Sequence, residues 1–277
     1  MRNDERQESG NPREATAENE FGTYAEPLIH EAISEASTLD TNKDAEVLHK
    51  LRVALRRLRT LLWAYRPLLN EDFDNQQRAV YKFLANAAGD TRNWDILIDL
   101  LDELKQPQLA RALRPNREKA SETSRTTLSH AHVKQVLQDA LREANRELGT
   151  AGTRTSMHKF AWKRVAAAEK QLNKRMKHAA ASPRSDYAAF HEVRKAGKKV
   201  RYLLEFFEPL LTKKERKGVK KLKILQKRLG ALNDVVASRQ LLQNDAAPTP
   251  DQTAMAHALR VLKKEQKRRA KAAAKLL

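Results

Sequence analysis

The chain has 277 residues, with 54 Lys or Arg against 35 Asp or Glu, so its formal net charge is +19 at neutral pH. The absence of cysteine excludes disulfides, thiolate nucleophiles and zinc sites built on cysteine. No apolar run approaches the roughly 18 residues that a membrane span requires, and the polar amino terminus does not resemble a signal peptide. These features predict a cytoplasmic protein with a polyanionic partner, and nucleic acid, polyphosphate and an anionic membrane surface all remain open.

Residues 1–22 are polar, hold six acids and three cations, and show no helical periodicity. We expect them to form a disordered acidic tail, which leaves a net charge of +22 on residues 23–277. In that remainder strand alternation is absent, and the few Gly and Pro residues stand between periodic segments, which predicts an all-α domain. The expected helices cover 24–38, 44–66, 72–88, 93–104, 107–113, 117–148, 154–181, 186–208, 213–229, 232–244 and 252–275.

The glycine-containing segment 149–152 divides these helices into two halves, about 23–150 and 153–277. The expected helices follow a similar order in the two halves, with six in the first half and five in the second. The simplest architecture for such a pattern is two pseudo-symmetric antiparallel four-helix bundles that arose from an internal duplication.

An internal repeat supports that division. Residues 48–69 align without a gap onto residues 190–211, and nine of the 22 aligned positions are identical. In each copy the apolar residues fall within one arc of a helical wheel, which predicts a helix with one face in the core. The apolar residues of the two arcs are Leu48, Leu51, Leu55, Leu58 and Leu62 in the first copy and Phe190, Val193, Val200 and Leu204 in the second.

Beside each apolar arc runs a ladder of potential cations at spacings of three, four and three residues. Like charges at these spacings are neighbours on a helix and destabilise it by about 0.2 to 0.5 kcal/mol per pair. A solvated basic face would explain one such ladder, but two matched copies favour a ligand. The ladders are His49, Arg52, Arg56 and Arg59 in the first copy and His191, Arg194, Lys198 and Arg201 in the second, with Arg57 and Lys199 as a further matched pair.

A fainter repeat follows the first. Residues 84–89 match residues 225–230, and each segment ends at a glycine suited to a helix stop. Further cations precede each glycine and are candidates for the same ligand: Arg78 and Lys82 in the first half, and Arg216, Lys220, Lys223 and Lys227 in the second.

At these residues the sequence resembles the CHAD family, the conserved histidine α-helical domain. The His and Arg-rich motif matches residues 48–59, its second copy matches residues 191–202, and the Leu-Gln, Leu-Gly and Asn-Asp element matches residues 225–234. The three motifs occur in order and the resemblance spans about residues 23–277. It implies two pseudo-symmetric four-helix bundles, basic helices that face a shared channel, affinity for inorganic polyphosphate and association with polyphosphate granules. Within the second motif it adds Lys195 and Tyr202 to the candidate polyphosphate-binding residues.

One position departs from the family pattern. After Gly89 the family usually has Arg-Asp, whereas this chain has Arg92-Asn93. If the usual acid orients a cation of the ladder, the first half holds its cations less firmly than the second.

A polyphosphate chain presents charge at every unit and no base edges. Arg suits it because a planar guanidinium can meet two oxygens, while Lys acts as a compact point charge. The two histidines could donate hydrogen bonds and gain charge beside a polyanion. Duplex nucleic acid is the alternative, bound without sequence specificity through its backbone. Single strands are disfavoured because aromatic residues, which stack on unpaired bases, make up only 5% of the chain.

The sequence predicts a binding protein rather than an enzyme. Phosphoryl hydrolysis normally needs acidic ligands for a metal, and no such constellation is present. A P-loop is also absent, and neither His-Glu pair extends to the second His of a zinc protease motif. We therefore expect no catalytic residue, no metal and no cofactor, and the pattern makes no prediction of an oligomeric state.

Overall fold

The computed structural model describes residues 15–213, 218–244 and 252–277, and within these ranges the chain forms helices and no strands. The all-α prediction is therefore confirmed. None of the described helices is long and apolar enough to cross a membrane. The α-helices are α1 (Ala17–Ser37), α2 (Ala45–Tyr65), α3 (Glu71–Ala87), α4 (Asp90–Glu103), α5 (Pro107–Ala112), α6 (Arg114–His130), α7 (Val133–Gly149), α8 (Met157–Ala181), α9 (Tyr187–Phe206), α10 (Val219–Asn244) and α11 (Gln252–Ala274). Two 3-10 turns, η1 (Arg66–Leu68) and η2 (Glu208–Leu210), follow α2 and α9.

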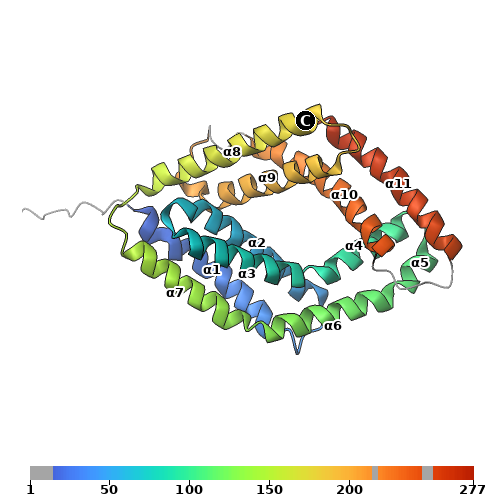
Figure 1. The fold of residues 1–277 in the computed structure, drawn as a ribbon, viewed down its shortest axis with the longest axis horizontal. Helices are drawn as coiled ribbons and strands as arrows, with labels where there is room; N and C mark the ends of the chain where they lie inside the picture. The colour runs from blue at the N-terminus through green and yellow to red at the C-terminus, as the bar shows by residue number, and fades with distance from the viewer. Residues whose placement is uncertain (1–14, 214–217, 245–251) are drawn as a thin grey trace, which may run out of the picture.

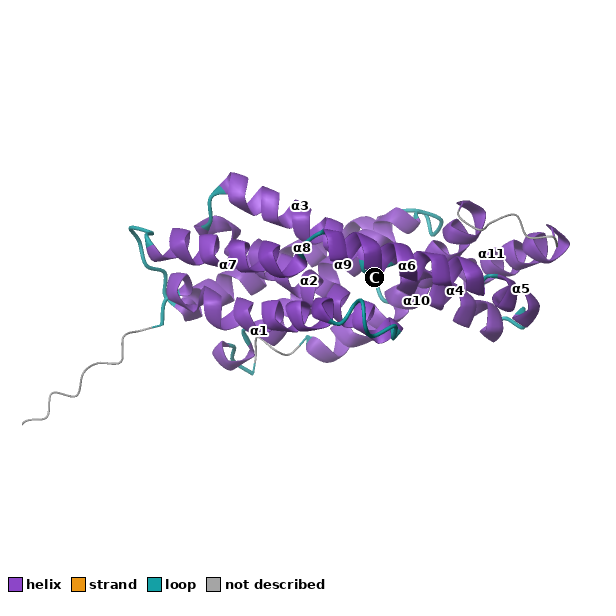
Figure 2. Cartoon of the chain, turned by 90° about the horizontal axis from the view of Figure 1, so that it is seen from below, coloured by secondary structure: helices purple, strands orange, loops and turns teal. Residues whose placement is uncertain are grey.

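The molecule is elongated, as Figures 1 and 2 show from two directions. Helices α1, α2, α3, α7, α8 and α9 lie toward one end, whereas α4, α5 and α11 lie toward the other, and α10 runs between them (Figure 1). All nine apolar residues predicted for the core faces of α2 and α9 are buried.

The two hydrophobic cores do not follow the two halves of the sequence. The larger core joins α1, α2, α3 and α7 to α8, α9 and the first part of α10. The smaller core joins Trp94 and Leu97 of α4 to Val235 of α10 and Leu262 of α11. Because α4 packs against α10, each core takes helices from both halves. The cores therefore do not confirm the expected pairing of helices into one bundle for about 23–150 and another for about 153–277.

The first helix starts inside the segment expected to be an acidic tail. Helix α1 begins at Ala17, so the boundary at residue 22 is wrong, while residues 1–14 lie outside the described part of the chain. The start of α1 is fixed against the start of α8: the Ala17 amide donates to the Thr155 carbonyl at 2.8 Å, and the buried Glu18 carboxylate accepts from the Thr155 amide at 2.9 Å. The contacts of α1 with Thr155 lie far apart in the sequence, so the sequence pattern does not reveal that the helix starts this early.

Two helix boundaries also differ from the expectation. The segment expected as one helix over 117–148 is broken between α6 and α7, where His132 adopts a left-handed backbone with φ of 46°. Helix α6 packs against α4 whereas α7 packs against α1, so the chain must change direction between them. Conversely, α10 continues through Gly230, where a helix stop was expected. Leu229 and Val235 place that helix in both cores, and this burial outweighs the glycine cost of about 1 kcal/mol.

Arg125 of α6 fixes the loop that leads into α2. Its guanidinium donates to the carbonyls of Leu39 and Asn42, each at 2.6 Å, and to that of Asp44 at 3.1 Å. We expect Arg125→Met to lower the free energy of unfolding by about 1 to 3 kcal/mol, because the partly buried Leu39 carbonyl loses its donor and two exposed carbonyls of the loop lose theirs. Chemical denaturation measures the loss. Arg114→Met, at an exposed position of the same helix, is the matched control and should change stability by less than about 0.5 kcal/mol.

Candidate anion-binding site

Helices α2 and α9 reproduce the sequence repeat in their local structure. Helix α2 starts at Ala45 and α9 starts at Tyr187, so their first residues are offset by the same distance along the chain as the aligned segments. Asp44 caps α2 and Asp186 caps α9, each by accepting a hydrogen bond from an amide of the first turn. Each helix is then followed by a 3-10 turn that contains a proline. The two ladders are thus presented by helices with matching caps and ends.

The helices pack against each other and bring the two ladders together. The charge of Arg56 on α2 lowers the pKa of both Arg194 and Lys198 on α9, and the charge of Arg194 lowers the pKa of Arg52. Such effects require proximity. We call the six arginine and lysine residues of these ladders, all of them half-buried, the α2–α9 cation cluster: Arg52, Arg56, Arg59, Arg194, Lys198 and Arg201.

Burial and like-charge repulsion both act on this cluster. Removal from water lowers the pKa of Arg52 to about 10, and the neighbouring Arg56 and Arg194 contribute to that lowering. The same two causes, burial first, lower the pKa of Lys198 to about 7. Burial is also the main cause of the lowered pKa of Arg59 and Arg194. The fold therefore holds these cations close together against an electrostatic cost, as expected of a site for an anion.

Several donors of the site lack an acceptor within the described part of the chain. The Nε atoms of Arg59 and Arg194 are buried and make no hydrogen bond. The Nε of Arg201 lies 3.3 Å from a carboxylate oxygen of Glu205, but without hydrogen-bond geometry. The Nδ1 of His49 is also buried without a partner, and burial lowers the pKa of its imidazole. An anion with several oxygens could satisfy such donors.

In the second half, α10 positions the groups of α9. Asn233 Oδ1 lies 2.7 Å from Nδ1 of His191, and the Gln226 side chain donates to the Gly197 carbonyl at 2.9 Å. The Asp234 carboxylate acts on Arg194, whose pKa it raises against the effect of burial. The polar residues of the Leu-Gln, Leu-Gly and Asn-Asp element thus contact or influence the second ladder.

The first half is held differently. Arg52 donates to the Gly89 carbonyl at 3.2 Å, and the exposed Arg92 lies close enough to lower the pKa of Arg52 and of His49. When the faint repeat that aligns Gly89 with Gly230 is extended, Arg92 stands where the second half has Asn233. The first half therefore carries an additional cation beside its histidine, in place of a hydrogen-bond partner.

Gly89 leaves the space that Arg52 occupies. A Cβ at Gly89 would lie 2.7 Å from Cζ of Arg52. We expect Gly89→Ala to displace this guanidinium and weaken anion binding about tenfold, the equivalent of one charge-assisted hydrogen bond, with little effect on helicity. Gly230→Ala is the matched control, since a Cβ there meets nothing within 4 Å. If Gly89→Ala weakens binding equally in an Arg52→Gln background, as a double-mutant cycle would show, displacement of Arg52 is not the cause.

Further cations extend the site toward α3 and α8. Arg78 of α3 pairs with the buried Asp74 at 3.3 Å and lowers the pKa of Arg59 and Lys199. Lys199 is half-buried, its Nζ lies 4.0 Å from the centre of the Trp63 ring, and burial followed by neighbouring charges lowers its pKa to about 8. Arg78 thereby links the cations of α2 to those on the outer side of α9.

The remaining predicted residues occupy other surroundings. Arg57 lies 5.4 Å from the centre of the Phe206 ring, and Tyr202 is buried beneath Arg201, which lies 4.9 Å from its ring centre. Lys195 is exposed and pairs with Glu192. The exposed residues on α3 and α10 are not among the main causes of the pKa shifts in the α2–α9 cation cluster: Lys82, Lys220, Lys223 and Lys227. Arg216 lies outside the described residues.

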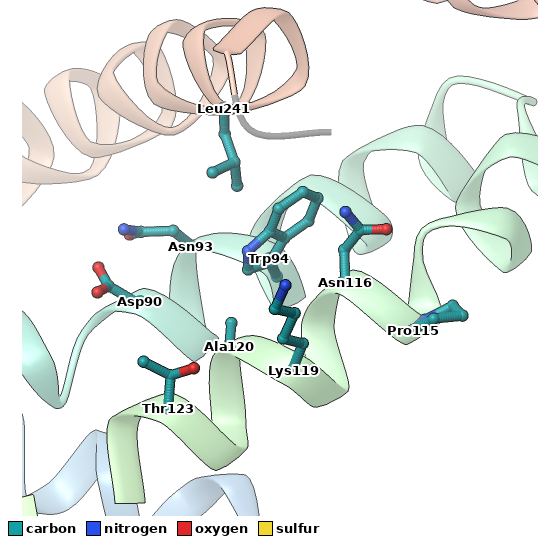
Figure 3. Close-up of a pocket in the computed structure, with 9 residues that line it drawn as sticks. All are labelled: Asp90, Asn93, Trp94, Pro115, Asn116, Lys119, Ala120, Thr123 and Leu241. Carbon is teal, nitrogen blue, oxygen red and sulfur yellow. The ribbon is translucent and has the colours of Figure 1, made fainter. Parts of the chain in front are cut away.

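A cavity of about 690 Å³ lies between α4, α6 and α10 (Figure 3). Its lining includes Asp90, Asn93 and Trp94 of α4 and Lys119 of α6, and none of the predicted polyphosphate-binding residues. Asn93, the residue that departs from the family pattern, therefore faces this cavity rather than the α2–α9 cation cluster. The cavity wall mixes a carboxylate, an ammonium group and an amide, unlike the purely cationic cluster.

Sequence reasoning missed three cations near the ladders. Arg92 could have been found, because the offset of the faint repeat aligns it with Asn233. Arg164 and Arg175 of α8 lower the pKa of Lys199, and Arg164 lies 4.2 Å from the Trp63 ring centre, on the same tryptophan as Lys199. No repeat or motif points to these two residues. Helix α1 occupies the place in the first half that α8 occupies in the second, and it carries no cations that match those of α8.

Comparisons with known proteins agree with the sequence motifs. The family model for the CHAD domain matches residues 25–243. The crystal structure of the CHAD domain from the plant Ricinus communis superposes with a TM-score of 0.78 at 23% identity, over 94% of this chain and 91% of that one. PptA from Streptomyces chartreusis superposes with a TM-score of 0.67 at 16% identity, over 95% and 98%. A search of curated proteins found no match. The family model covers most of the chain, which therefore belongs to the CHAD family, a family associated with polyphosphate binding.

Proposed function

We propose that this protein binds inorganic polyphosphate, without catalysis, through the α2–α9 cation cluster. The observation that carries the proposal is the meeting of two cation ladders, half-buried, on helices that pack against each other. Successive oxygens of one phosphate chain can accept hydrogen bonds from guanidinium groups on both helices. Binding of this kind would also bring the protein to polyphosphate granules, as the family resemblance suggests.

The partial burial of the cluster favours a narrow polyanion over a duplex. A single phosphate chain can follow donors that are partly shielded by two helices, and the buried Nε atoms of Arg59 and Arg194 need an acceptor that reaches them. A nucleic-acid duplex presents its phosphates on the outside of a wide cylinder, and it would contact exposed lysines more readily. The lysines of α10 at positions 220, 223 and 227 are exposed and support duplex binding as the second candidate function.

We expect the polymer to stay intact and its binding to need no divalent metal. The test incubates the protein with long-chain polyphosphate, with Mg²⁺ or Mn²⁺ or with a chelator. It measures chain length by gel electrophoresis, free phosphate by a colorimetric assay and the bound fraction by filter retention. Equal retention with and without metal, at unchanged chain length, is expected. Catalytic shortening above the protein-free control would make the protein an enzyme and contradict the proposal.

A further inference from the structure

Lys198 is half-buried in the α2–α9 cation cluster, with Arg194 four residues before it and Arg201 three residues after it on the same face of α9, and α2 packs against this helix. From α2 the charges of Arg56 and Arg52 act on it, and from its own helix those of Arg194 and Arg201. From α10, the charge of the Asp234 carboxylate raises the pKa of Arg194, but it is not among the main charges that shift the pKa of Lys198. From α8, the charges of Arg164 and Arg175 lower the pKa of the neighbouring Lys199 and are not among the main charges that shift the pKa of Lys198.

This arrangement makes Lys198 different from the guanidinium groups around it. Arginine stays charged at every physiological pH, so repulsion within the cluster is relieved most easily by the loss of the lysine proton. Burial and the four guanidinium groups lower the pKa of Lys198 to about 7, so its amine gives up a proton far more readily than an ordinary lysine does. The exposed Lys195, three residues earlier on α9, forms an ion pair with Glu192 instead.

We propose that polyphosphate binding draws a proton onto Lys198, and that the affinity of the site therefore falls as pH rises above neutrality. This inference rests on the proposed function. A bound phosphate chain replaces repulsion by attraction at the amine, so it favours the charged form and raises the proton affinity of Lys198. Between the pKa values of the free and the bound state, binding takes up a proton, and by linkage a higher pH opposes binding.

Calorimetry measures this proton directly. The heat of polyphosphate binding at pH 7.5 is compared in two buffers that have different ionisation enthalpies, and the difference gives the number of protons taken up. For a pKa of about 7, Lys198 contributes about three-quarters of a proton at that pH. The histidines, Lys199 and the terminal phosphates also titrate, so the informative quantity is the difference between the parent protein and Lys198→Arg, which keeps the charge but does not titrate. Lys263→Arg, at an exposed position of α11, is the matched control and should take up the same number of protons as the parent.

The outcomes separate this inference from the proposed function. A fall in proton uptake of about 0.5 or more in Lys198→Arg, with binding retained, supports the coupling. Equal proton uptake in Lys198→Arg and the parent overturns it and leaves polyphosphate binding intact, whereas an absence of binding by the parent protein overturns both. If Lys198→Arg does not fold, the affinity of the parent protein for polyphosphate is measured between pH 6.5 and 8.5 at fixed ionic strength. An affinity that stays constant over this range contradicts the coupling.

Discussion

Replacing Arg52, Arg56 and Arg59 together with Gln is expected to weaken the binding of long-chain polyphosphate about a hundredfold or more. Charge-assisted hydrogen bonds contribute about 1.5 to 3 kcal/mol each, and even a partial loss of three exceeds the roughly 2.7 kcal/mol that a hundredfold requires. Replacing Arg194, Lys198 and Arg201 with Gln should have a similar effect, because both ladders belong to one cluster. Fluorescence titration with a labelled chain measures both losses.

The fold should survive either set of replacements. The cluster residues repel one another, so their removal should leave helicity unchanged and the melting temperature at or above that of the parent protein. Circular dichroism checks this, and unfolded variants would not count as evidence about binding.

The matched control removes the same charge from another helix. Lys263, Lys264 and Lys267 of α11 are exposed, and their replacement with Gln lowers the net charge by three. Arg268 is a poorer choice because it forms an ion pair with Glu265 at 2.6 Å. The control should lose less than about threefold in affinity, as expected for charges that act only at long range. A control that loses as much affinity as either ladder variant would show that binding depends on net charge and not on the cluster.

The second large effect is that of salt. For a flexible single-stranded polyanion, the logarithm of affinity falls with the logarithm of salt concentration by about 0.7 per neutralised phosphate. Six contacts at the α2–α9 cation cluster thus give a slope of about −4, and a fourfold rise in salt should weaken binding by roughly two orders of magnitude. Either ladder variant should reduce the steepness of the slope by about 2, because three contacts are lost. A slope near zero in the parent protein would contradict a site built from cations.

The helices that carry the cluster were predictable because local chemistry decides them. In α2, the cap at Asp44, the apolar arc and the closing proline turn all agree, and α9 repeats each feature at the aligned positions of the second copy. The ladders border the buried arcs, so their position at the edge of the core follows from helical geometry. For these two helices the sequence contains most of the information that the structure uses.

The partners of these helices were not predictable from the repeat. The packing of α4 against α10 depends on contacts between distant parts of the chain, such as Trp94 with the core around Val235, and no local pattern encodes such a choice. The same holds for the continuation of α10 through Gly230, where burial in two cores overrides the local preference. Because α10 is continuous, it can present Gln226 and Asn233 to α9 on one rigid helix.

The structure also separates cations that the sequence treats alike. Lys198 and Lys220 both lie in basic helical stripes, but Lys198 is half-buried among guanidinium groups and Lys220 is exposed. Exposure depends on which neighbouring helix covers a face, and a single stripe does not reveal it. The exposed lysines of α10 therefore remain predicted contacts, whereas the cluster residues share one electrostatic environment.

Competition between long-chain polyphosphate and duplex DNA, at the same salt concentration and the same concentration of phosphate units, tests polyphosphate binding at the α2–α9 cation cluster most directly. A labelled polyphosphate chain is bound to the parent protein and displaced by either unlabelled polymer, and the titration is repeated with Arg52, Arg56 and Arg59 replaced by Gln. We expect polyphosphate to compete at least tenfold better than DNA with the parent protein, and the ladder variant to lose that preference. Equal competition by the two polymers, or a preference that persists in the ladder variant, would contradict recognition of polyphosphate by these helices.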